Sequence, residues 1–368
     1  MQQFYQLQYI PIIVRSYLKL ISEMKIIFVF CCFISLIQTI SAQSFRNYFV
    51  VQKDSNYIEN YSNDLIIRLY SGEKSHSLGL NDLNNPYGIK YLPNGYYNLG
   101  LGINYKWIGI SLAIKVPFLL NSEIRKGETK RIGFQSYLYS GKFAVDFLSS
   151  YLKGYYLDNS YVHLNSFSKE LEYQRRDIRS MNFGLAVNYV VNNSKFSYKA
   201  AFSDTEKQKR SAGSFLLGGS LFSYQTKADS AFIPAELSSE FYLKTRDLYK
   251  IGVLALNANL GYAYSLVFLK NGIFTASYLL GAGYQLNSFE GVSEEGLKNW
   301  TFGLKHTGRF GLGYRYNRYY ARISVIRSTQ YTNLKYNDLS VGNGTNFMQI
   351  SLAKRFFMNE MNKKRPVE

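Results

Sequence analysis

Cysteine, proline and histidine are scarce in this chain of 368 residues, and each shortage narrows the chemistry it can carry. It has 2 Cys, 6 Pro and 3 His. Both cysteines, Cys31 and Cys32, lie inside one apolar run near the N-terminus. A chain cleaved after that run has no disulfide, no thiolate nucleophile and no cysteine metal ligand. A lipid anchor is not expected, because a lipoprotein cysteine would stand at the end of the run.

Long apolar segments are scarce as well. The one continuous run, residues 26–37, reads IIFVFCCFISLI, follows Lys25 and precedes a polar, small-residue patch. It is too short to span a bilayer comfortably, and its charged start, apolar centre and small-residue end are typical of a secretory signal. We predict an export signal over residues 1–42, with Met24 as the true start and Ala42 as the last residue before cleavage. A retained signal anchor is the alternative.

Acidic residues are outnumbered, with 25 Asp and Glu against 43 Lys and Arg and a formal net charge of +18 at pH 7. Nucleic acid is the usual partner of such a charge, but the chain has no basic helix, finger or ribonucleoprotein motif, and export removes it from nucleic acid. In a barrel, Lys and Arg serve as contacts to lipid phosphates or as an anion-favouring lumen. The densest basic clusters, all expected in loops, are Arg125, Lys126, Lys130 and Arg131; Arg175, Arg176 and Arg179; and Lys207, Lys209 and Arg210.

Aromatic residues and strict alternation are abundant. Phe, Tyr and Trp make up 17% of the chain. In residues 97–116, YNLGLGINYKWIGISLAIKV, apolar side chains occupy every second position of two arms that meet at Trp107. A period of two indicates β-strands, and each arm has about the 9–11 residues that cross a bilayer. The mean hydropathy of −0.18 excludes a bundle of transmembrane helices but suits a barrel with an apolar outside and a polar inside.

The alternation recurs along the chain without a sustained helical period, so we predict an all-β fold, a single antiparallel transmembrane β-barrel within residues 43–357. The predicted strands are 65–70, 97–106, 108–116, 132–140, 142–152, 179–190, 195–203, 214–224, 251–268, 273–284, 300–316, 319–327 and 346–357. These are thirteen ranges, whereas single-chain bacterial barrels have an even number of strands. Either residues 214–224 do not span or a further strand lies near residues 241–245. We predict about 12 strands, with 14 as the alternative.

Connection lengths and strand ends predict an orientation. Short turns follow residues 106, 140, 191, 270 and 316, and longer gaps lie at 71–96, 117–131, 153–178, 225–250, 285–299 and 328–345. Outer-membrane barrels have short periplasmic turns and long outer loops. Aromatic pairs at strand ends predict interfacial girdles: Tyr96 and Tyr97, Tyr105 and Trp107, Tyr155 and Tyr156, Tyr319 and Tyr320, and Phe356 and Phe357. A secreted β-sandwich or propeller is the competing fold, but no repeat near 40 residues is visible.

The last predicted strand, NFMQISLAKRFF, ends on aromatic residues, like the terminal signal that barrel-assembly machinery recognises. Residues 358–368 are expected to form a short polar periplasmic tail. The expected location is therefore the outer membrane of a Gram-negative bacterium. The expected partners are outer-membrane lipid, lipopolysaccharide and the assembly machinery, and not nucleic acid.

Two segments resemble a known family. The sequences QKRSAGSFLLGGSLFSYQ (208–225) and NANLGYAYSLVFLKNGIFTASYLLGAG (257–283) are similar to the domain-of-unknown-function family 4421, DUF4421, whose members are exported proteins expected to form outer-membrane barrels. The resemblance extends over roughly residues 45–357. It implies a fold and a location, with no assigned activity and no functional residue to carry over.

Catalysis would need a serine nucleophile and a histidine base within hydrogen-bond reach. The three histidines allow two such sets on paper: His76 with Ser75 or Ser77 and Asp82, and His163 with Ser166; His306 has no such partner in sequence. None lies in a motif resembling outer-membrane phospholipase. We expect no enzyme and no catalytic residue.

Metal, cofactor and phosphate sites are not expected either. Asp54, Glu59 and Asp64 are dispersed, and Glu290 with Glu294 and Glu295 could hold a loop calcium only by accident. The sequence GNGTN at 342–346 lacks the lysine and following helix of a phosphate loop and is expected to be an outer loop. We therefore predict a barrel that acts as a pore or as a structural or binding element. A lipid-modifying barrel with a Ser/His pair is the alternative.

Overall fold

The computed structural model describes residues 51–83, 88–95, 97–105, 108–115, 123–158, 172–235, 245–291, 297–334 and 339–357. All belong to one structural unit, Val51–Glu368. Antiparallel strands dominate these ranges, which confirms the predicted all-β class. In the same ranges, no helix is long and apolar enough to cross a membrane. The predicted export signal, residues 1–42, and the predicted tail, residues 358–368, lie outside the described residues.

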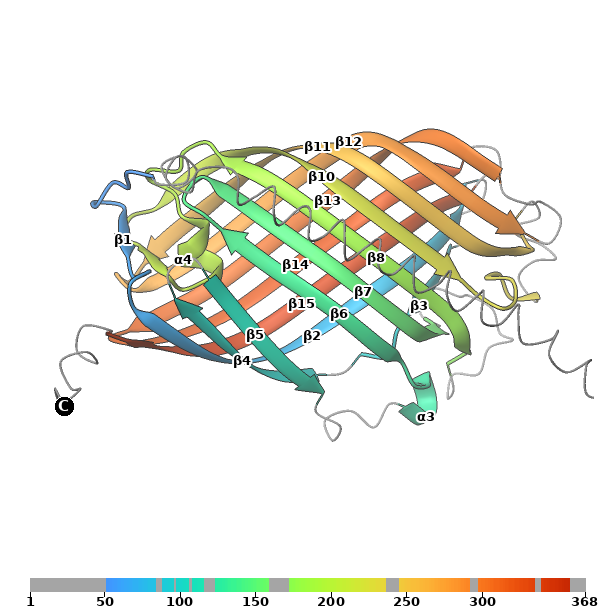
Figure 1. Cartoon of the computed structure of the whole chain (residues 1–368), viewed down its shortest axis with the longest axis horizontal. Helices are drawn as coiled ribbons and strands as arrows, with labels where there is room; N and C mark the ends of the chain where they lie inside the picture. Colours follow the sequence, from blue (N-terminus) through green and yellow to red (C-terminus); the bar gives the residue numbers. More distant parts are fainter. Residues whose placement is uncertain are drawn as a thin grey trace, which may run out of the picture. The chain divides into compact units, whose positions relative to one another are not determined.

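The strands and helices keep the labels of Figure 1. The strands are β1 (Ile58–Asn60), β2 (Leu65–Asp82), β3 (Gly88–Leu92), β4 (Tyr97–Tyr105), β5 (Ile108–Lys115), β6 (Lys130–Tyr139), β7 (Phe143–Leu157), β8 (Gln174–Val190), β9 (Glu206–Gln208), β10 (Ala212–Lys227), β11 (Leu248–Phe268), β12 (Gly272–Gly291), β13 (Leu297–Tyr316), β14 (Tyr319–Leu334) and β15 (Leu339–Phe356). Two short helices are α3 (Glu123–Lys126) and α4 (Tyr198–Phe202).

Ten strands form a closed antiparallel barrel (Figure 1). Around the wall their order is β2, β15, β14, β13, β12, β11, β10, β8, β7 and β3, and β3 returns to β2. The first and last long strands close the ring through a ladder that runs from Leu65↔Phe356 to Asp82↔Leu339. Closure pairs the backbone groups of the wall with each other, which an apolar surrounding requires.

Three further strands flank the short β3. Strand β4 pairs with the half of β2 that β3 leaves open, and β5 pairs with β4, with Tyr105 opposite Ile108 at the turn. Strand β6 pairs with β7. The hairpin predicted at 97–116 is therefore confirmed. Within the described ranges β5 pairs with β4 alone and β6 with β7 alone, so the wall has two open edges there.

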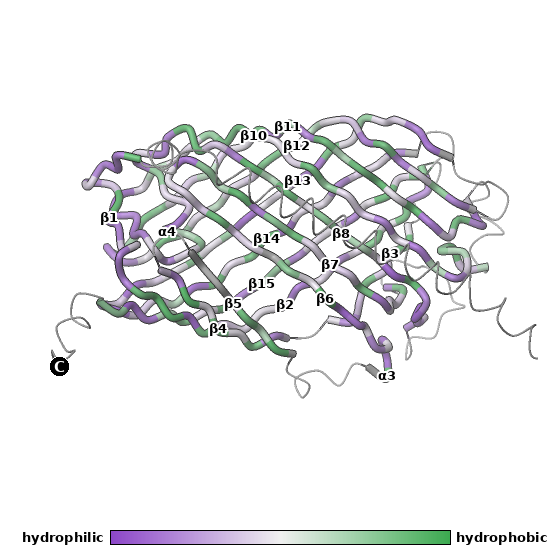
Figure 2. Tube along the Cα trace, viewed as in Figure 1, coloured by the Kyte–Doolittle hydropathy of each residue, from purple (hydrophilic) through white to green (hydrophobic). Residues whose placement is uncertain are grey.

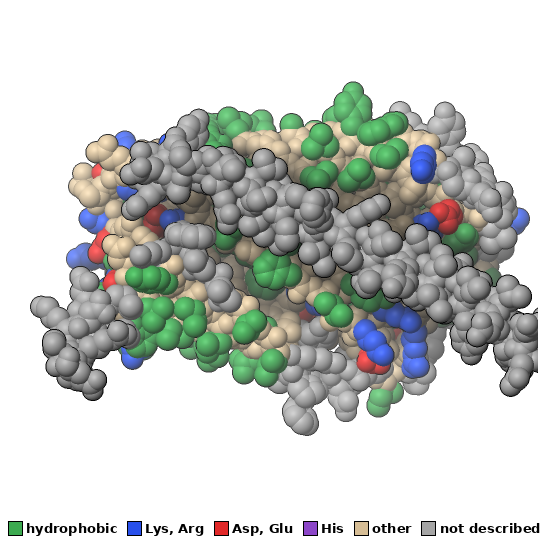
Figure 3. All heavy atoms as spheres, viewed as in Figure 1, with side chains coloured by type: hydrophobic (Ala, Val, Ile, Leu, Met, Phe, Trp, Pro, Cys, Tyr) green, Lys and Arg blue, Asp and Glu red, His purple; other side chains and the backbone are tan. Residues whose placement is uncertain are grey.

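The two faces of the wall follow the sequence alternation. In β4, Leu99, Leu101 and Ile103 are 44–52% exposed, whereas Gly100 and Asn104 are buried. Figure 2 shows hydrophobic and hydrophilic residues alternating along most strands. On the face seen in Figure 3, hydrophobic side chains gather over β4 and β5, and charged side chains lie toward the two ends of the barrel. The apolar face points outward, because a lipid-facing barrel reverses the polarity of a soluble one.

Exposed aromatic residues form two levels on the outer face. Tyr284, Trp300 and Phe302 are 59–69% exposed near the long-loop end, and Tyr316 and Tyr319 are 65% and 56% exposed near the opposite turn. Leu260 and its cross-strand partner Leu280 lie between the levels. Such levels are typical of membrane-interface girdles. The predicted interfacial position is wrong for Tyr155, Tyr156 and Tyr320, because these side chains are buried. Tyr96 and Trp107 lie outside the described residues.

Several strands extend further than predicted. Strand β2 continues from the predicted 65–70 to Asp82, and β15 begins at Leu339, so GNGTN at 342–346 lies in a strand and not in an outer loop. Glycine and polar residues do not interrupt these strands, because alternate positions face a polar lumen. With strands of 15 to 21 residues in most of the wall, the barrel is longer than the roughly 9–11 residues per strand that a bilayer needs.

The predicted strand at 195–203 is wrong. These residues form a turn and helix α4, whereas residues 214–224, which were in doubt, lie within β10. Asn192 donates from its side chain to the Gly213 carbonyl oxygen (2.8 Å) and so ends the β8 ladder against β10. Ser197 then caps α4. The alternation of Phe196, Tyr198, Ala200 and Phe202 misleads because the three aromatic side chains pack together with buried residues of the wall, such as Tyr139 and Leu216, and do not form an outward face. Of residues 241–245, only Thr245 is described.

The outward orientation of the leucine band can be tested at Leu260, which is 59% exposed and lies between Leu217 and Leu280 on neighbouring strands. We expect Leu260→Arg to lower the free energy of unfolding by about 2–4 kcal/mol, because arginine is placed in the middle of the lipid-facing band. The measurement is urea unfolding in lipid vesicles, followed by heat-modifiable gel migration. Leu260→Ala is the control for lost side-chain volume. Equal stability of the two variants would contradict the orientation.

Candidate functional site

The inward faces of the strands enclose a lumen with three zones. At the short-turn end lies the segment 191–211, which connects β8 to β10 and which we call the plug. At the long-loop end lies the segment 228–235, which follows β10 and which we call the cap. A polar band with a cavity lies between them. In Figure 1 the plug, with α4, is at the left end of the barrel and α3 is toward the right end.

The plug begins with a capped helix. Ser197 has an extended backbone (φ −127°, ψ 113°), and its hydroxyl accepts a hydrogen bond from the Ala200 N–H (3.1 Å), which makes it the N-cap of α4. The Tyr198 ring packs at 5.6 Å from both Tyr139 and Phe202. Its hydroxyl donates to the Ser277 hydroxyl on β12 (2.9 Å). Aromatic packing and one polar contact thus fix α4 against the wall.

Two buried arginines of the wall hold the other end of α4. Arg322 on β14 donates to the Ala201 carbonyl oxygen (3.0 Å) and forms an ion pair with Asp204 (2.8 Å), both side chains being 2% exposed. Asp204 has a φ of 65°, a left-handed conformation that turns the chain after the helix. Arg315 on β13 donates to the Glu206 carbonyl oxygen (3.2 Å). Cations at the C-terminal end of a helix also match its dipole.

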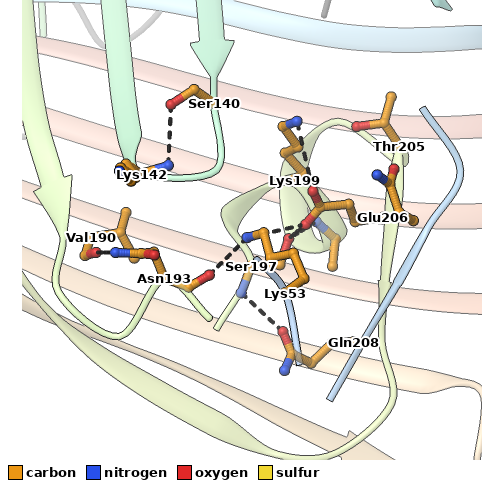
Figure 4. Close-up of polar contacts among 12 residues, drawn as sticks. Lys53, Ser140, Lys142, Val190, Asn193, Ser197, Lys199, Thr205, Glu206 and Gln208 are labelled. Atoms are coloured by element: carbon orange, nitrogen blue, oxygen red, sulfur yellow. Dashed lines mark hydrogen bonds and ion pairs between the residues drawn. The ribbon is translucent and has the colours of Figure 1, made fainter. Parts of the chain in front are cut away.

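Glu206 joins the plug to the N-terminal segment (Figure 4). Its carboxylate accepts a hydrogen bond from the Ser197 hydroxyl and lies 3.7 Å from the ammonium groups of both Lys53 and Lys199, while the side chain is 2% exposed. Burial lowers the pKa of Lys53, although the Glu206 charge acts in the opposite direction. Strand β1 also pairs with β9, with Ile58 opposite Gln208. The N-terminal segment therefore covers the plug at the short-turn end.

A buried ion pair crosses the lumen above the plug. The Arg309 guanidinium on β13 donates to both carboxylate oxygens of Asp146 on β7, with 3.1 Å from Nη1 to Oδ1. The same Nη1 donates to the Tyr139 hydroxyl (3.0 Å), and the guanidinium lies 5.9 Å from the Tyr198 ring centre. Two charges removed from water are tolerable only when paired in good geometry, and a bidentate arginine supplies it. The pair separates the plug from the cavity.

The cavity has a volume of about 90 Å³. Its charged lining consists of Asp146, Arg309 and Lys305. It exists because several inward positions are small, among them Gly184, Ala186 and Gly281. A Cβ at Gly184 would meet its nearest neighbour, the Phe222 ring, at 3.4 Å, so a methyl group would fit there in ordinary contact.

The cap closes the long-loop end with apolar side chains. Phe232 and Ile233 are 0% and 3% exposed and cluster with buried residues of the wall that include Leu80, Leu157 and Val341. The Tyr91 hydroxyl donates to the Phe232 carbonyl oxygen. Arg175, which forms an ion pair with Asp177 (2.9 Å), donates to the Ala231 carbonyl oxygen (2.7 Å). Both ends of the lumen are thus filled by the chain itself.

The structure does not bring the candidate catalytic residues together. On β2, His76 faces the lumen, whereas Ser75 and Ser77 point to the opposite face of the strand. Neither serine can therefore form the catalytic set with His76 and Asp82 that the sequence allowed. The ring of His76 contacts Thr345 (3.5 Å), and its Nε2 atom has no hydrogen-bond partner among the described residues. His306 contacts the Tyr278 hydroxyl. His163 and Ser166 lie outside the described residues.

The basic clusters are less uniform than predicted. Arg125 and Lys126 lie in α3, at the long-loop end. Arg131 and Arg175, however, belong to strands β6 and β8 and point to backbone carbonyl oxygens of Lys74 and Ala231. Lys207 and Lys209 lie at the plug and bind Asn271 (3.0 Å) and the Ser55 carbonyl oxygen (2.8 Å). The expectation of loop positions is therefore wrong for Lys130 and Arg131 in β6, for Arg175, Arg176 and Arg179 in β8, and for Lys207 in β9.

The dispersed carboxylates have structural partners. Asp54 accepts from the Asn56 N–H (2.9 Å), Asp64 lies 3.8 Å from Arg355, and Glu290 forms an ion pair with Lys250. No group of three His, Asp or Glu side chains in the described ranges could hold a metal ion. Glu294 and Glu295 lie outside those ranges.

The residues that organise the lumen escaped the sequence analysis. They are Asp146, Asp204, Glu206, Lys305, Arg309, Arg315 and Arg322. A usable signal existed, because Lys305, Arg309 and Arg315 share one parity in the predicted strand 300–316, opposite to Leu304 and Phe310. Charged residues on the polar face of a predicted membrane strand mark the lumen. Their partners lie far away in sequence, so the pairs themselves had no signal.

The chain was compared with protein families, curated proteins and solved structures. The profile of DUF4421, a domain of unknown function, matches residues 52–356. No curated protein matches the sequence. Three solved structures are similar: outer membrane protease OmpT from Escherichia coli (8% identity, 81% of this chain and 98% of OmpT covered, TM-score 0.38), toluene transporter TodX from P. putida (9%, 80% and 90%, 0.25) and outer membrane protein OprG from Pseudomonas aeruginosa (10%, 82% and 99%, 0.25). Similarities of this size carry no conclusion about activity.

The ion pair between Asp146 and Arg309 predicts strong coupling between the two side chains. We expect Arg309→Met to lower the free energy of unfolding by about 3–5 kcal/mol, because it leaves Asp146 as an unpaired buried charge. The double variant Arg309→Met, Asp146→Leu should recover most of that loss. Urea unfolding of the three proteins in vesicles measures both effects. Additive losses in the double variant would show that the two residues do not interact.

Proposed function

This chain belongs to the DUF4421 family, and we propose that it is an outer-membrane β-barrel of a Gram-negative bacterium whose lumen is closed at rest and admits or binds a small solute. The observation that carries this proposal is that the plug and the cap, both parts of the same chain, fill the two ends of a polar lumen that holds a cavity. The role is passage or binding, without catalysis.

The outer face supports insertion into a membrane. Leucine, isoleucine and phenylalanine side chains are exposed along most of the wall, and aromatic levels flank them. In water such a surface would be a large aggregation-prone patch. Residues 1–42 act as a cleaved export signal in this proposal, and the terminal strand β15 is the element read by the assembly machinery.

The ends of the barrel suit contact with lipid headgroups. At the short-turn rim, Arg318 lies 4.3 Å from the Phe357 ring centre and Lys354 lies 5.2 Å from that of Tyr319. Cations beside interfacial aromatic rings can reach lipid phosphates while their apolar stems stay against the barrel. Arg125 and Lys126 at the opposite end suit lipopolysaccharide phosphates. Outer-membrane lipid and lipopolysaccharide are thus the proposed surroundings.

We propose that the wall in the membrane has twelve strands. Strand β4 pairs with β2, β5 pairs with β4, and β6 pairs with β7. A pairing between β5 and β6 would therefore complete a second path from β2 to β7, outside β3, and close a ring of twelve strands. An even number of strands is the rule for such barrels. Unpaired strand edges facing lipid would be costly, which favours this closure.

Gating by the plug predicts a conductance difference. We expect the full chain in planar bilayers to be silent or nearly so. Residues 194–210 can be replaced with a short Gly/Ser turn, because the two ends of the segment are close together: the Asn192 side chain donates to the Gly213 carbonyl oxygen. This variant should produce stable current steps whose size increases with salt concentration. Arg322→Met should give intermittent steps, because the end of α4 loses its hydrogen bond and ion pair.

The matched control is Arg327→Met, which removes an exposed arginine from the same strand without touching the plug. Heat-modifiable migration of every variant shows that the barrel has formed. Steps of equal size in the unmodified chain and in the plug replacement would overturn the proposed closed state.

The twelve-strand wall predicts proximity between β5 and β6. With Cys at Leu112 on β5 and at one of Ile132, Phe134 or Leu138 on β6, a short bismaleimide should cross-link at least one pair efficiently in the folded barrel. These positions all lie on the exposed, outer face. Leu112 combined with Leu260, on the remote strand β11, is the control. Failure of all three β6 partners would contradict closure between these strands.

A further inference from the structure

The cavity in the middle of the lumen carries one uncompensated positive charge. Its charged lining residues are Asp146, Arg309 and Lys305. Arg309 already holds both carboxylate oxygens of Asp146. Among the residues that the structure describes, no carboxylate lies within 4.0 Å of the Lys305 ammonium group. The cavity therefore has an Asp–Arg pair that is neutral as a unit, and a lysine that forms no ion pair of its own among the described residues.

Lys305 projects across the cavity. It lies on β13, and its ammonium nitrogen is 5.4 Å from the centre of the Phe222 ring on β10, which is not a neighbour of β13 in the wall. The ring face offers partial compensation only. A desolvated ammonium group is costly unless an anion pairs with it. The position of Lys305 thus favours an anion inside the cavity.

A second polar atom points to the same space. The Asn343 side chain lines the cavity and is 4% exposed, and its Oδ1 atom has no hydrogen-bond partner among the described residues. Most neighbouring polar side chains satisfy one another, such as Asn259 with Asn188 (3.1 Å) and Thr307 with Ser328 (3.0 Å). A buried acceptor without a donor is unusual in proteins and indicates water or a ligand.

The size and the apolar part of the lining limit the anion. A volume of about 90 Å³ compares with about 10–15 Å³ for one water on this measure, so a molecule of a few heavy atoms fits. One free cation favours a monoanion over a phosphate dianion. Phe222, Leu279, Ile326 and Phe347 also line the space, and they disfavour a strongly hydrated inorganic ion. From these observations, we propose that the cavity binds a short-chain monocarboxylate, with the carboxylate on Lys305 and the alkyl chain against these side chains.

This inference deepens the proposed function and rests on it, because it names the class of solute that the closed lumen holds. Water in the cavity can carry the hydrogen bond to Asn343. Since the plug and the cap enclose the site, binding is to be measured after the full chain has been refolded with the ligand present. The probe is butyrate labelled at its carboxylate carbon, followed by NMR and by dialysis equilibrium.

The expected result is saturable butyrate binding with about one molecule per barrel. Lys305→Met should weaken it at least about tenfold, the ratio that corresponds to about 1.4 kcal/mol. Ala186→Leu, which fills the cavity and keeps the charge, should also abolish it. Lys298→Met is the matched control, because this lysine lies on the same strand with its side chain exposed; it should bind butyrate normally. Butyramide, the uncharged analogue, should not bind.

Three outcomes would overturn the monocarboxylate site. They are absence of butyrate binding in folded protein refolded with the ligand, binding unaffected by Lys305→Met or Ala186→Leu, and tighter binding of inorganic phosphate or chloride than of butyrate. Conductance separates this failure from that of the closed lumen. A plug replacement that conducts while the full chain is silent keeps the closed lumen even if butyrate does not bind.

Discussion

The structure depends on one constraint, that backbone N–H and C=O groups surrounded by apolar material must bond to each other. The wall meets it by returning to its first long strand, through the ladder between β2 and β15. Once the sheet is closed, successive side chains of a strand face either the lipid or the lumen. The outward leucines and aromatics and the inward asparagines, serines and arginines follow from that closure. The lumen then needs its own solution for buried polar groups.

On strands β13 and β14 that solution is three buried arginines, each bound to oxygen atoms of other segments. Arg309, Arg315 and Arg322 are buried, and each contacts two oxygen atoms or more across the lumen. A planar guanidinium has several donors in fixed directions and is more weakly hydrated than an ammonium group, so it loses less on burial. Lys305 is the exception in the cavity lining, since its single compact charge has no fork and faces an aromatic ring. This contrast agrees with the proposed role of Lys305 in binding a solute anion.

Much of the wall could be predicted from sequence because period two is a local signal. The hairpin of β4 and β5, the long β11 and β12 and the terminal β15 all have alternation over many residues, and the structure confirms them as antiparallel neighbours. Strand ends were less predictable. Residues 71–82 and 339–345 are polar and glycine-containing, and they are strands because they pair with neighbours that are distant in sequence: with each other, and residues 71–82 in part with β3 and β4.

The contents of the lumen were out of reach for a local reading. The alternating residues 195–203 form part of the plug, where the apolar side chains pack inside the barrel, so their alternation does not mark a lipid-facing side. Asp146 and Arg309 are 163 positions apart, and no pattern in either strand names the other. The parity of charged residues in predicted strands identifies the polar face, but the pairing and the cavity arise from how the ring closes.

The plug has its two ends built into adjacent wall strands, since it leaves β8 and returns as β10. A domain attached at one end could be withdrawn from the barrel as a whole. A loop attached at both ends cannot, because its anchors are hydrogen-bonded side by side. Any opening must therefore be a local melting or refolding inside the lumen, with the helix and its arginine contacts as the units that break. Its reversal is fast and intramolecular, since the separated parts stay at high effective concentration beside their sites.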